Sequence, residues 1–269
     1  MKIILSRKGF DSQYGGQPSP ILPDGTLLSL PIPLPGELIR YDELRYQDKT
    51  YLEMIRSLNP RSSKIHAATT LHLDPDLRKD IYPNRLPGWK PMFGQCDAAQ
   101  GALRNSGIGV NDLFLFFGWF KQTEWVNGLL QYKKGSPDLH VIYGYLQVGA
   151  VYTYSTPLPA FAALHPHAAP AYQQIKSNCI YVAGDTLSFN HKLPGAQTLA
   201  YHPGLVLTKE GMSRSRWQLP HFFKNVRMTY HNHNSFKENY FQSRAKGQEF
   251  IIEENEAVLE WVKGLIEGN

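Results

Sequence analysis

Residues 112–119 read Asp-Leu-Phe-Leu-Phe-Phe-Gly-Trp, and this stretch decides the fold. Five apolar residues follow the aspartate without a break, and a short apolar run rich in aromatic rings is typical of a buried strand. Residues 139–145 and 146–152 are rich in Val, Ile and Tyr and predict one further long strand or two shorter ones. The loop at 133–138, with its Gly and Pro, is typical of a hairpin connection. The centre of the protein is therefore predicted to be a sheet of long strands.

Shorter elements flank this centre. The helix at 51–58 has Asp48 or Thr50 as its expected N-cap. The final helix carries its apolar residues at helical spacing and is therefore amphipathic. The remaining patterns predict strands at 3–5, 27–32, 64–71 and 177–182, the first two paired, and helices at 95–105 and 255–266. Together they predict an α+β fold with a mixed or barrel-like β core, flanking helices and a C-terminal amphipathic helix. We expect one domain over residues 1–269, with the barrel-like core at 64–156.

The bulk composition favours an intracellular protein with an anionic partner. The chain has 269 residues, a net charge of +5 and only two cysteines, Cys96 and Cys179. Two cysteines make no disulfide framework, so a reducing cytoplasm is expected. No apolar run is long enough for a membrane span, and the opening residues become polar too soon for a signal peptide. The basic balance favours polyanions such as DNA or nucleotides.

The segment that follows the first predicted strand has the residues of a phosphate-binding loop. Arg7 and Lys8 supply positive charge, while Gly15 and Gly16 let backbone amides approach an anion. Asp11 lies between them and is a candidate for proton transfer. The segment matches no established phosphate-loop motif, and a surface turn capped by Asp11 is the alternative interpretation.

A second polar group follows at residues 72–78. His72 and Asp74, with a further carboxylate at Asp76, suit acid–base catalysis. We therefore predict Asp11, His72 and Asp74 as catalytic residues. The alternative is a helix start, since Asp-Pro-Asp is also common there. If a divalent ion is needed, Asp74 or Asp76 is its expected ligand.

Two pairs of histidines are separated by one residue each. His165 pairs with His167, and His231 with His233. Neither pair has the i,i+4 spacing of a helical metal site or a cysteine partner. The sequence therefore predicts no metal site, and it indicates no particular cofactor. Cys96 is expected to be half-buried rather than reactive.

The order of several long blocks resembles the nucleotide modification associated domain, type three, a family of bacteria and phages. The similarity runs from Met1 to about Trp261. Its blocks are MKIILSRKGFDSQYGGQPSPILPDGTLLSLPIP, GVNDLFLFFGWF, HVIYGYLQVGAVY, SRSRWQLPHFF and KGQEFII. The resemblance implies an association with hypermodification of DNA bases or with the processing of modified nucleotides. Arg216, in the fourth block, is a further candidate for phosphate binding.

The middle of the chain also resembles PUA-like barrels, including the base-reading EVE and YTH domains. The resemblance rests on residues 111–116 and 141–148, although Asn111 replaces the usual glycine. Those domains hold a flipped base in an aromatic pocket. The resemblance implies that Trp119, Trp125 and Tyr143 stack on a base.

Three functions follow as hypotheses. The first is an enzyme that acts on a nucleobase or nucleotide, in DNA or free. The second is a non-catalytic reader of modified bases, which would have an aromatic pocket without converging acids. The third is an accessory subunit that binds partner proteins of a modification or defence system. The first predicts that Arg7, Asp11 and His72 line one cleft near the aromatic strand.

Overall fold

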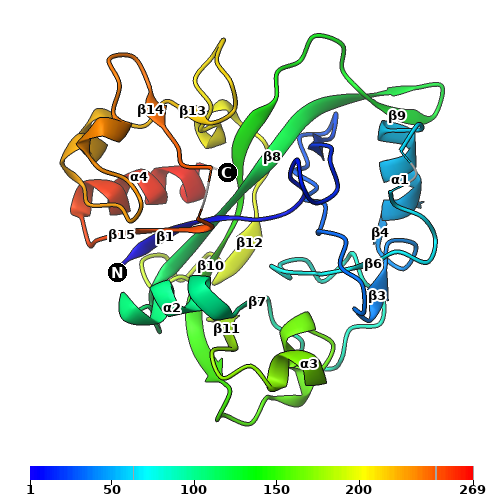
Figure 1. The fold of residues 1–269 in the computed structure, drawn as a ribbon, viewed down its shortest axis with the longest axis horizontal. Coiled ribbons are helices and arrows are strands. Elements are labelled where there is room, and N and C mark those ends of the chain that lie inside the picture. Colours follow the sequence, from blue (N-terminus) through cyan, green and yellow to red (C-terminus); the bar gives the residue numbers. More distant parts are fainter. Residues whose placement is uncertain (63, 246, 269) are drawn as a thin grey trace.

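The computed structural model describes residues 1–62, 64–245 and 247–268, and two long antiparallel strands cross its centre. These are β8 (Leu113–Val126) and β10 (Leu139–Thr153), drawn in green in Figure 1. β10 continues through both predicted segments as one strand, with a bulge near Gly144. The apolar run of β8 is buried, as its composition predicts. The two strands are therefore the framework to which the other elements attach.

The other strands extend this pair into an open mixed sheet. β1 and β2 run parallel to β8, and the remaining pairings are antiparallel. Among the described residues the order is β15 (Glu249–Ile252), β1 (Ile3–Arg7), β8, β10, β11 (Cys179–Ala183) and β7 (Met92–Gln95), with β12 (Ala196–Thr198) on β10 and both β2 (Ser19–Ile21) and β9 (Leu129–Tyr132) on β8. The α+β prediction is confirmed. The sheet does not close into a barrel within this part of the chain, because its path ends at β15 and β7.

Helices and small strand pairs surround the sheet (Figure 1). The α-helices are α1 (Tyr51–Leu58), α2 (Asp97–Asn105), α3 (Pro170–Gln173) and α4 (Glu256–Glu267). The two-stranded pairs are β3 (Ile39–Arg40) with β6 (Thr70–Leu71), β4 (Arg45–Tyr46) with β5 (Lys49–Thr50), and β13 (Arg216–Trp217) with β14 (Phe241–Gln242). Short 3₁₀ helices occur at Ala160–Ala162, Pro166–Ala168, Pro203–Leu205, His221–Asn225 and His233–Ser235. No helix of the described residues is long and apolar enough to cross a membrane.

The helix predictions are confirmed to within two residues at each end. Thr50 caps α1 in a full capping box, in which its hydroxyl accepts from Glu53 N–H and the Glu53 carboxylate accepts from Thr50 N–H. The apolar face of α4 packs on the main core through Val258 and Val262. Local signals decide these helices, since caps and periodicity act within one or two turns.

Two predicted strands are wrong or much shorter. Residues 27–32 form no strand, and they do not pair with β1, which lies between β8 and β15. Leu28 and Leu30 are fully buried without strand pairing, and Pro31 has no amide to donate to a ladder. Of residues 64–71, only Thr70 and Leu71 are in a strand.

Candidate functional site

A cleft of about 850 Å³ gathers most of the predicted site residues. Residues from the end of β1, from the segment after β6, from β8 and from the loop before β13 line it together. The predicted residues among its lining are Arg7, Lys8, Asp11, His72, Asp74 and Trp119. The lining also includes Gln95, Cys96, His140, His167, Tyr172, Arg214 and Arg244, which we call with them the cleft residues. Arg7, Asp11 and His72 thus line one cleft, the arrangement that the enzyme hypothesis predicts.

The charged groups of the cleft are mainly cations. Arg7 donates to the carbonyls of Ala245 and Gly247 at 2.6 and 2.7 Å, which ties β1 to the loop before β15. Burial lowers the pKa of Arg7, although Asp11 opposes this effect. The ammonium of Lys8 lies 3.1 Å from buried Glu249, so its charge is already paired. The cleft residues include four Lys or Arg against two carboxylates, which favours an anionic ligand.

Arg214 contributes a further cation to the cleft, although it was not among the residues predicted from the sequence. Its guanidinium lies 3.9 Å from the centre of the Trp119 ring and donates to the hydroxyl of Ser12. Arg216, which we predicted instead, lies outside the cleft, above the ring of Tyr240. Arg214 lies in the turn before β13 and Arg216 is the first residue of β13, so the rule that strand residues two apart share a face does not apply to this pair.

The glycine segment folds into a turn instead of an open anion loop. The carboxylate of Asp11 accepts from the amides of Gln13 and Tyr14 at 2.7 and 2.6 Å. Gly15 has a positive φ, and a side chain there would meet the ring of Phe10. Gly15 and Gly16 lie outside the cleft. Asp11 therefore caps this turn, as the alternative interpretation of the sequence has it, and its side chain also lines the cleft.

Three ligand-type side chains meet at the buried end of the cleft. His72, Asp74 and His167 each offer one nitrogen or oxygen atom, and these atoms lie within 4.8 Å of one another. His72 follows β6, whereas His167 lies in the 3₁₀ helix Pro166–Ala168. All three residues are buried. Such a group can hold a cation or move a proton between buried atoms.

Hydrogen bonds fix the orientation of both imidazoles. His72 Nδ1 lies 2.8 Å from Glu37 Oε1, and His72 Nε2 lies 4.0 Å from Asp74 Oδ2. His167 Nδ1 lies 2.7 Å from the amide oxygen of Asn178. Because both acceptors are oxygens, each Nδ1 carries the proton and each Nε2 of a neutral ring keeps its lone pair. Burial lowers the pKa of His167 to about 3, so this ring is neutral near pH 7.

Asp74 is held by groups on its other oxygen. Gly94 N–H donates to Oδ1 at 2.7 Å, and His165 Nε2 lies 3.2 Å from the same atom. That histidine contact lacks the geometry of a good hydrogen bond. Burial raises the pKa of Asp74, but the His165 contact and the positive charge of Lys8 act together against it, and the pKa lies below its usual range. Asp74 is therefore a buried carboxylate that stays ionised.

Gly94 is needed for this packing. A Cβ at this position would lie 2.3 Å from the His167 ring and 2.9 Å from the His165 ring. The backbone of β7 thus runs directly against both imidazoles, and it supplies an amide to Asp74. A local constraint on one strand residue therefore sets the position of two histidines and one carboxylate.

Asp76 has a different environment although only Pro75 separates it from Asp74. Arg85 donates to both of its oxygens, and Trp89 Nε1 donates to Oδ2 at 3.1 Å. Asp76 lies outside the cleft. Its carboxylate is occupied by an ion pair that fixes the 85–89 segment.

The three predicted stacking residues lie in three different environments. Trp119 lines the cleft, but Arg214 covers one face of its ring. Trp125 is exposed near the β8–β9 turn, and Tyr143 is 2 % exposed in the core. The ring that does lie in the cleft beside the histidines is Tyr172, 4.4 Å from the His167 ring centre. Nothing in the local sequence around Tyr172 distinguishes it, because its position depends on the packing of α3.

Two further cleft residues are not reactive groups at neutral pH. Burial raises the pKa of the Cys96 thiol to about 11, so the thiol is protonated. Burial lowers the pKa of His140 to about 3, and Trp217 Nε1 donates to its Nδ1 at 3.0 Å. These residues shape the wall of the cleft.

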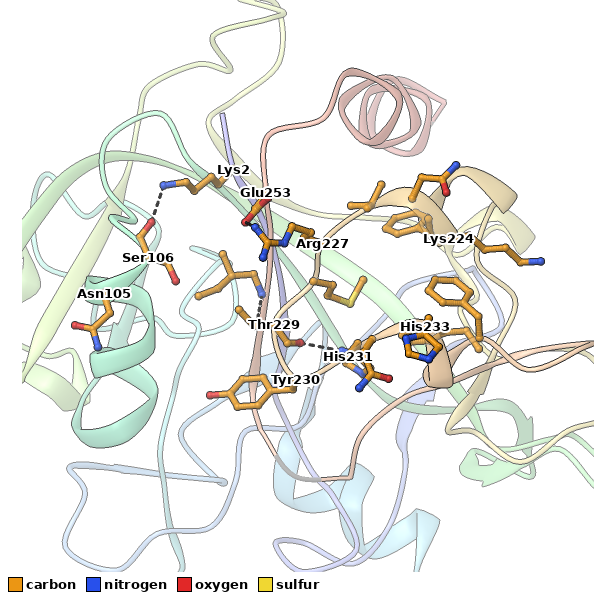
Figure 2. Close-up of a pocket in the computed structure, with 18 residues that line it drawn as sticks. Lys2, Asn105, Ser106, Lys224, Arg227, Thr229, Tyr230, His231, His233 and Glu253 are labelled. Atoms are coloured by element: carbon orange, nitrogen blue, oxygen red, sulfur yellow. Dashed lines mark hydrogen bonds and ion pairs between the residues drawn. The ribbon is translucent and has the colours of Figure 1, made fainter.

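A second hollow of about 870 Å³ lies beside β15 and contains His231 and His233 (Figure 2). Two of its polar side chains are engaged with neighbours: Lys2 donates to Ser106 O at 2.6 Å, and His231 Nδ1 lies 2.9 Å from Thr229 O. Glu253 pairs with Arg227 at 3.4 Å in an exposed position. No buried carboxylate is among its lining residues, so we place the candidate site in the cleft despite the similar volumes.

Comparison with known families agrees with the similarity seen in the sequence blocks. The family described as nucleotide modification associated domain 3 matches residues 2–253. The chain belongs to this family. The matched range of the nucleotide modification associated domain contains every cleft residue, together with Glu37, His165 and Asn178. No curated protein and no solved structure matches the chain.

Proposed function

We propose that this protein is an enzyme that modifies or processes a nucleotide, either free or within DNA. The observation that carries the proposal is the single cleft in which the cations Arg7 and Arg214 occur together with His72, Asp74 and His167. The family supports a role connected with nucleotide modification. An anionic nucleotide supplies the negative charge that the cations favour, and the buried cluster supplies groups able to act on it.

The phosphate binds to the cations of the cleft, with Arg214 as the main contact. Its guanidinium is half-buried and already lies over the Trp119 ring, which reduces the entropy lost on binding. Planar guanidinium groups bind phosphate in a bidentate manner. The base lies toward Tyr172, whose ring is next to His167.

Binding and turnover are tested with the same reagents. We would incubate the purified protein with free nucleotides and short DNA, unmodified and hypermodified, at two salt concentrations, and follow mass changes of the nucleotide by mass spectrometry. Binding should weaken with salt, and Arg214→Ala should lower the slope of log affinity against log salt by about 1. Arg227→Ala, in the hollow of Figure 2, is the matched control and should leave binding unchanged.

A reader of modified bases is the second candidate, and the same experiment separates it from an enzyme. Salt-sensitive binding without any mass change would favour the reader. The convergence of Asp74 with two histidines speaks for the enzyme, because a reader needs no buried acid in its pocket. Absence of binding at low salt contradicts both and favours the accessory subunit, which purification with partner proteins would then test.

A further inference from the structure

The buried cluster of the cleft has the composition of a metal centre that the spacing of the histidines does not reveal. His72, Asp74 and His167 come from separate segments, and one ligand-type atom of each lies within 4.8 Å of the other two. We propose that these residues bind one divalent transition-metal ion, such as zinc, manganese or iron(II), through the two Nε2 atoms and Asp74 Oδ2.

The hydrogen bonds around the cluster leave those three atoms available. Glu37 and Asn178 accept from the Nδ1 atoms of His72 and His167, so both Nε2 lone pairs remain free. The amide of Gly94 bonds Asp74 Oδ1, which leaves Oδ2 directed at His72 Nε2. Metal-binding histidines almost always donate their other N–H to a carboxylate or carbonyl oxygen in this way. The cluster thus has its supporting hydrogen bonds already in place.

The charge balance points to a cation. The side chains of Asp74 and Glu37 are 4 % and 6 % exposed, and two buried carboxylates are costly without a counterion. The charge of Lys8 acts on Asp74, but its ammonium is paired with Glu249 at 3.1 Å. A protonated imidazole would offset one of the two charges, whereas a divalent ion offsets both.

The ligand types and their spacing select the class of metal. Ligands of one ion at about 2.0–2.2 Å lie roughly 3.0–3.5 Å apart, so the 4.0 Å between His72 Nε2 and Asp74 Oδ2 must shorten slightly. Imidazole nitrogens suit zinc and iron, and the carboxylate also suits manganese, while magnesium and calcium require mainly oxygen ligands. Three protein ligands beside a cleft leave a coordination position for water or a ligand, as in catalytic rather than structural sites.

Metal binding is measured directly, so this test does not depend on the proposed nucleotide chemistry. We would prepare the full chain free of metal with a chelator and titrate zinc and manganese by calorimetry, with magnesium as the comparison. One ion per chain should bind and raise the melting temperature, because an ion that binds only the folded state stabilises it. Magnesium should bind at least 100-fold more weakly. Equal affinity for magnesium, or no binding by the folded protein, would overturn the proposal.

Variants assign the ion to these residues. His72→Ala and His167→Ala should each lower zinc affinity at least 100-fold, and Glu37→Gln, which weakens the acceptor of His72 Nδ1, should lower it 10- to 100-fold. His66→Ala removes an exposed histidine and should leave affinity unchanged. His167→Gln keeps a side chain in the same space and serves if the alanine variant does not fold, as judged by circular dichroism. A loss of affinity in His66→Ala equal to that in His167→Ala would show adventitious binding and contradict the site.

Discussion

The same short pattern, two histidines separated by one residue, contributes His167 to the cleft and both His231 and His233 to the hollow of Figure 2, with opposite outcomes. His167 meets a buried carboxylate and a third imidazole, and its Nδ1 is fixed by Asn178. His231 uses both ring nitrogens on the backbone, with Thr229 O at 2.9 Å and Arg244 N–H at 3.2 Å. The pattern therefore carries no function by itself. The two regions differ because Asp74, from a distant segment of the chain, lies next to His167, whereas no buried carboxylate is among the described residues that line the hollow.

The largest expected difference concerns the two arginine–carboxylate pairs near these regions. Arg85→Ala should lower the free energy of unfolding by about 3–5 kcal/mol, because it leaves the buried Asp76 carboxylate without its partner. Arg227→Ala, which breaks an exposed pair, should have a far smaller effect. Denaturant unfolding of both variants measures the difference. Equal losses in the two variants would mean that burial of the Arg85–Asp76 pair does not increase its contribution to the free energy of unfolding.

The packing of β7 against the histidines gives the next effect. Gly94→Ala places a methyl group against His167 and His165, and it should cost about 1–3 kcal/mol of unfolding free energy through overpacking. Gly101→Ala is the matched control in α2, where the new methyl group meets nothing and should raise helix stability by up to about 1 kcal/mol. Thermal unfolding compares the two variants. A neutral Gly94→Ala would show that the two imidazoles move freely and are not held in place.

The smallest expected effect is a pH dependence of stability that His140, in the wall of the cleft, causes. His140 has a folded pKa of about 3, lowered by burial and then by Arg214 and Arg7, against about 6.5 when unfolded. The unfolded chain binds more protons between these values, so this histidine lowers stability by about 1.4 kcal/mol per pH unit as the pH falls below 6.5.

Replacing His140 isolates its contribution to the pH dependence of the unfolding free energy. His140→Gln cannot take up this proton, so its unfolding free energy should fall less between pH 6.5 and 5.5 than that of the natural protein. Unfolding curves at the two pH values measure the difference. Parallel losses in both proteins would show that other groups cause the acid sensitivity.

The sequence alone predicted the elements whose signals are local. The apolar run at 112–119, the Thr50 cap and the spacing of the last helix each act over a few residues, and the structure contains all three. It also predicted six residues that line one cleft. The strand at 27–32 was wrong because its leucines are buried by loop packing, which apolar alternation does not distinguish from a sheet.

The composition of the candidate centre was decided by the tertiary structure. His72 and His167 lie 95 positions apart in the chain, and no local pattern joins them. The packing of the 3₁₀ helix Pro166–Ala168 against Gly94 brings them together. Tertiary contacts also give Asp74 and Asp76 different partners, because Gly94 N–H donates to Asp74 whereas Arg85 donates to both oxygens of Asp76. Periodicity and caps are encoded over a few residues, whereas a buried polar site depends on contacts between distant segments.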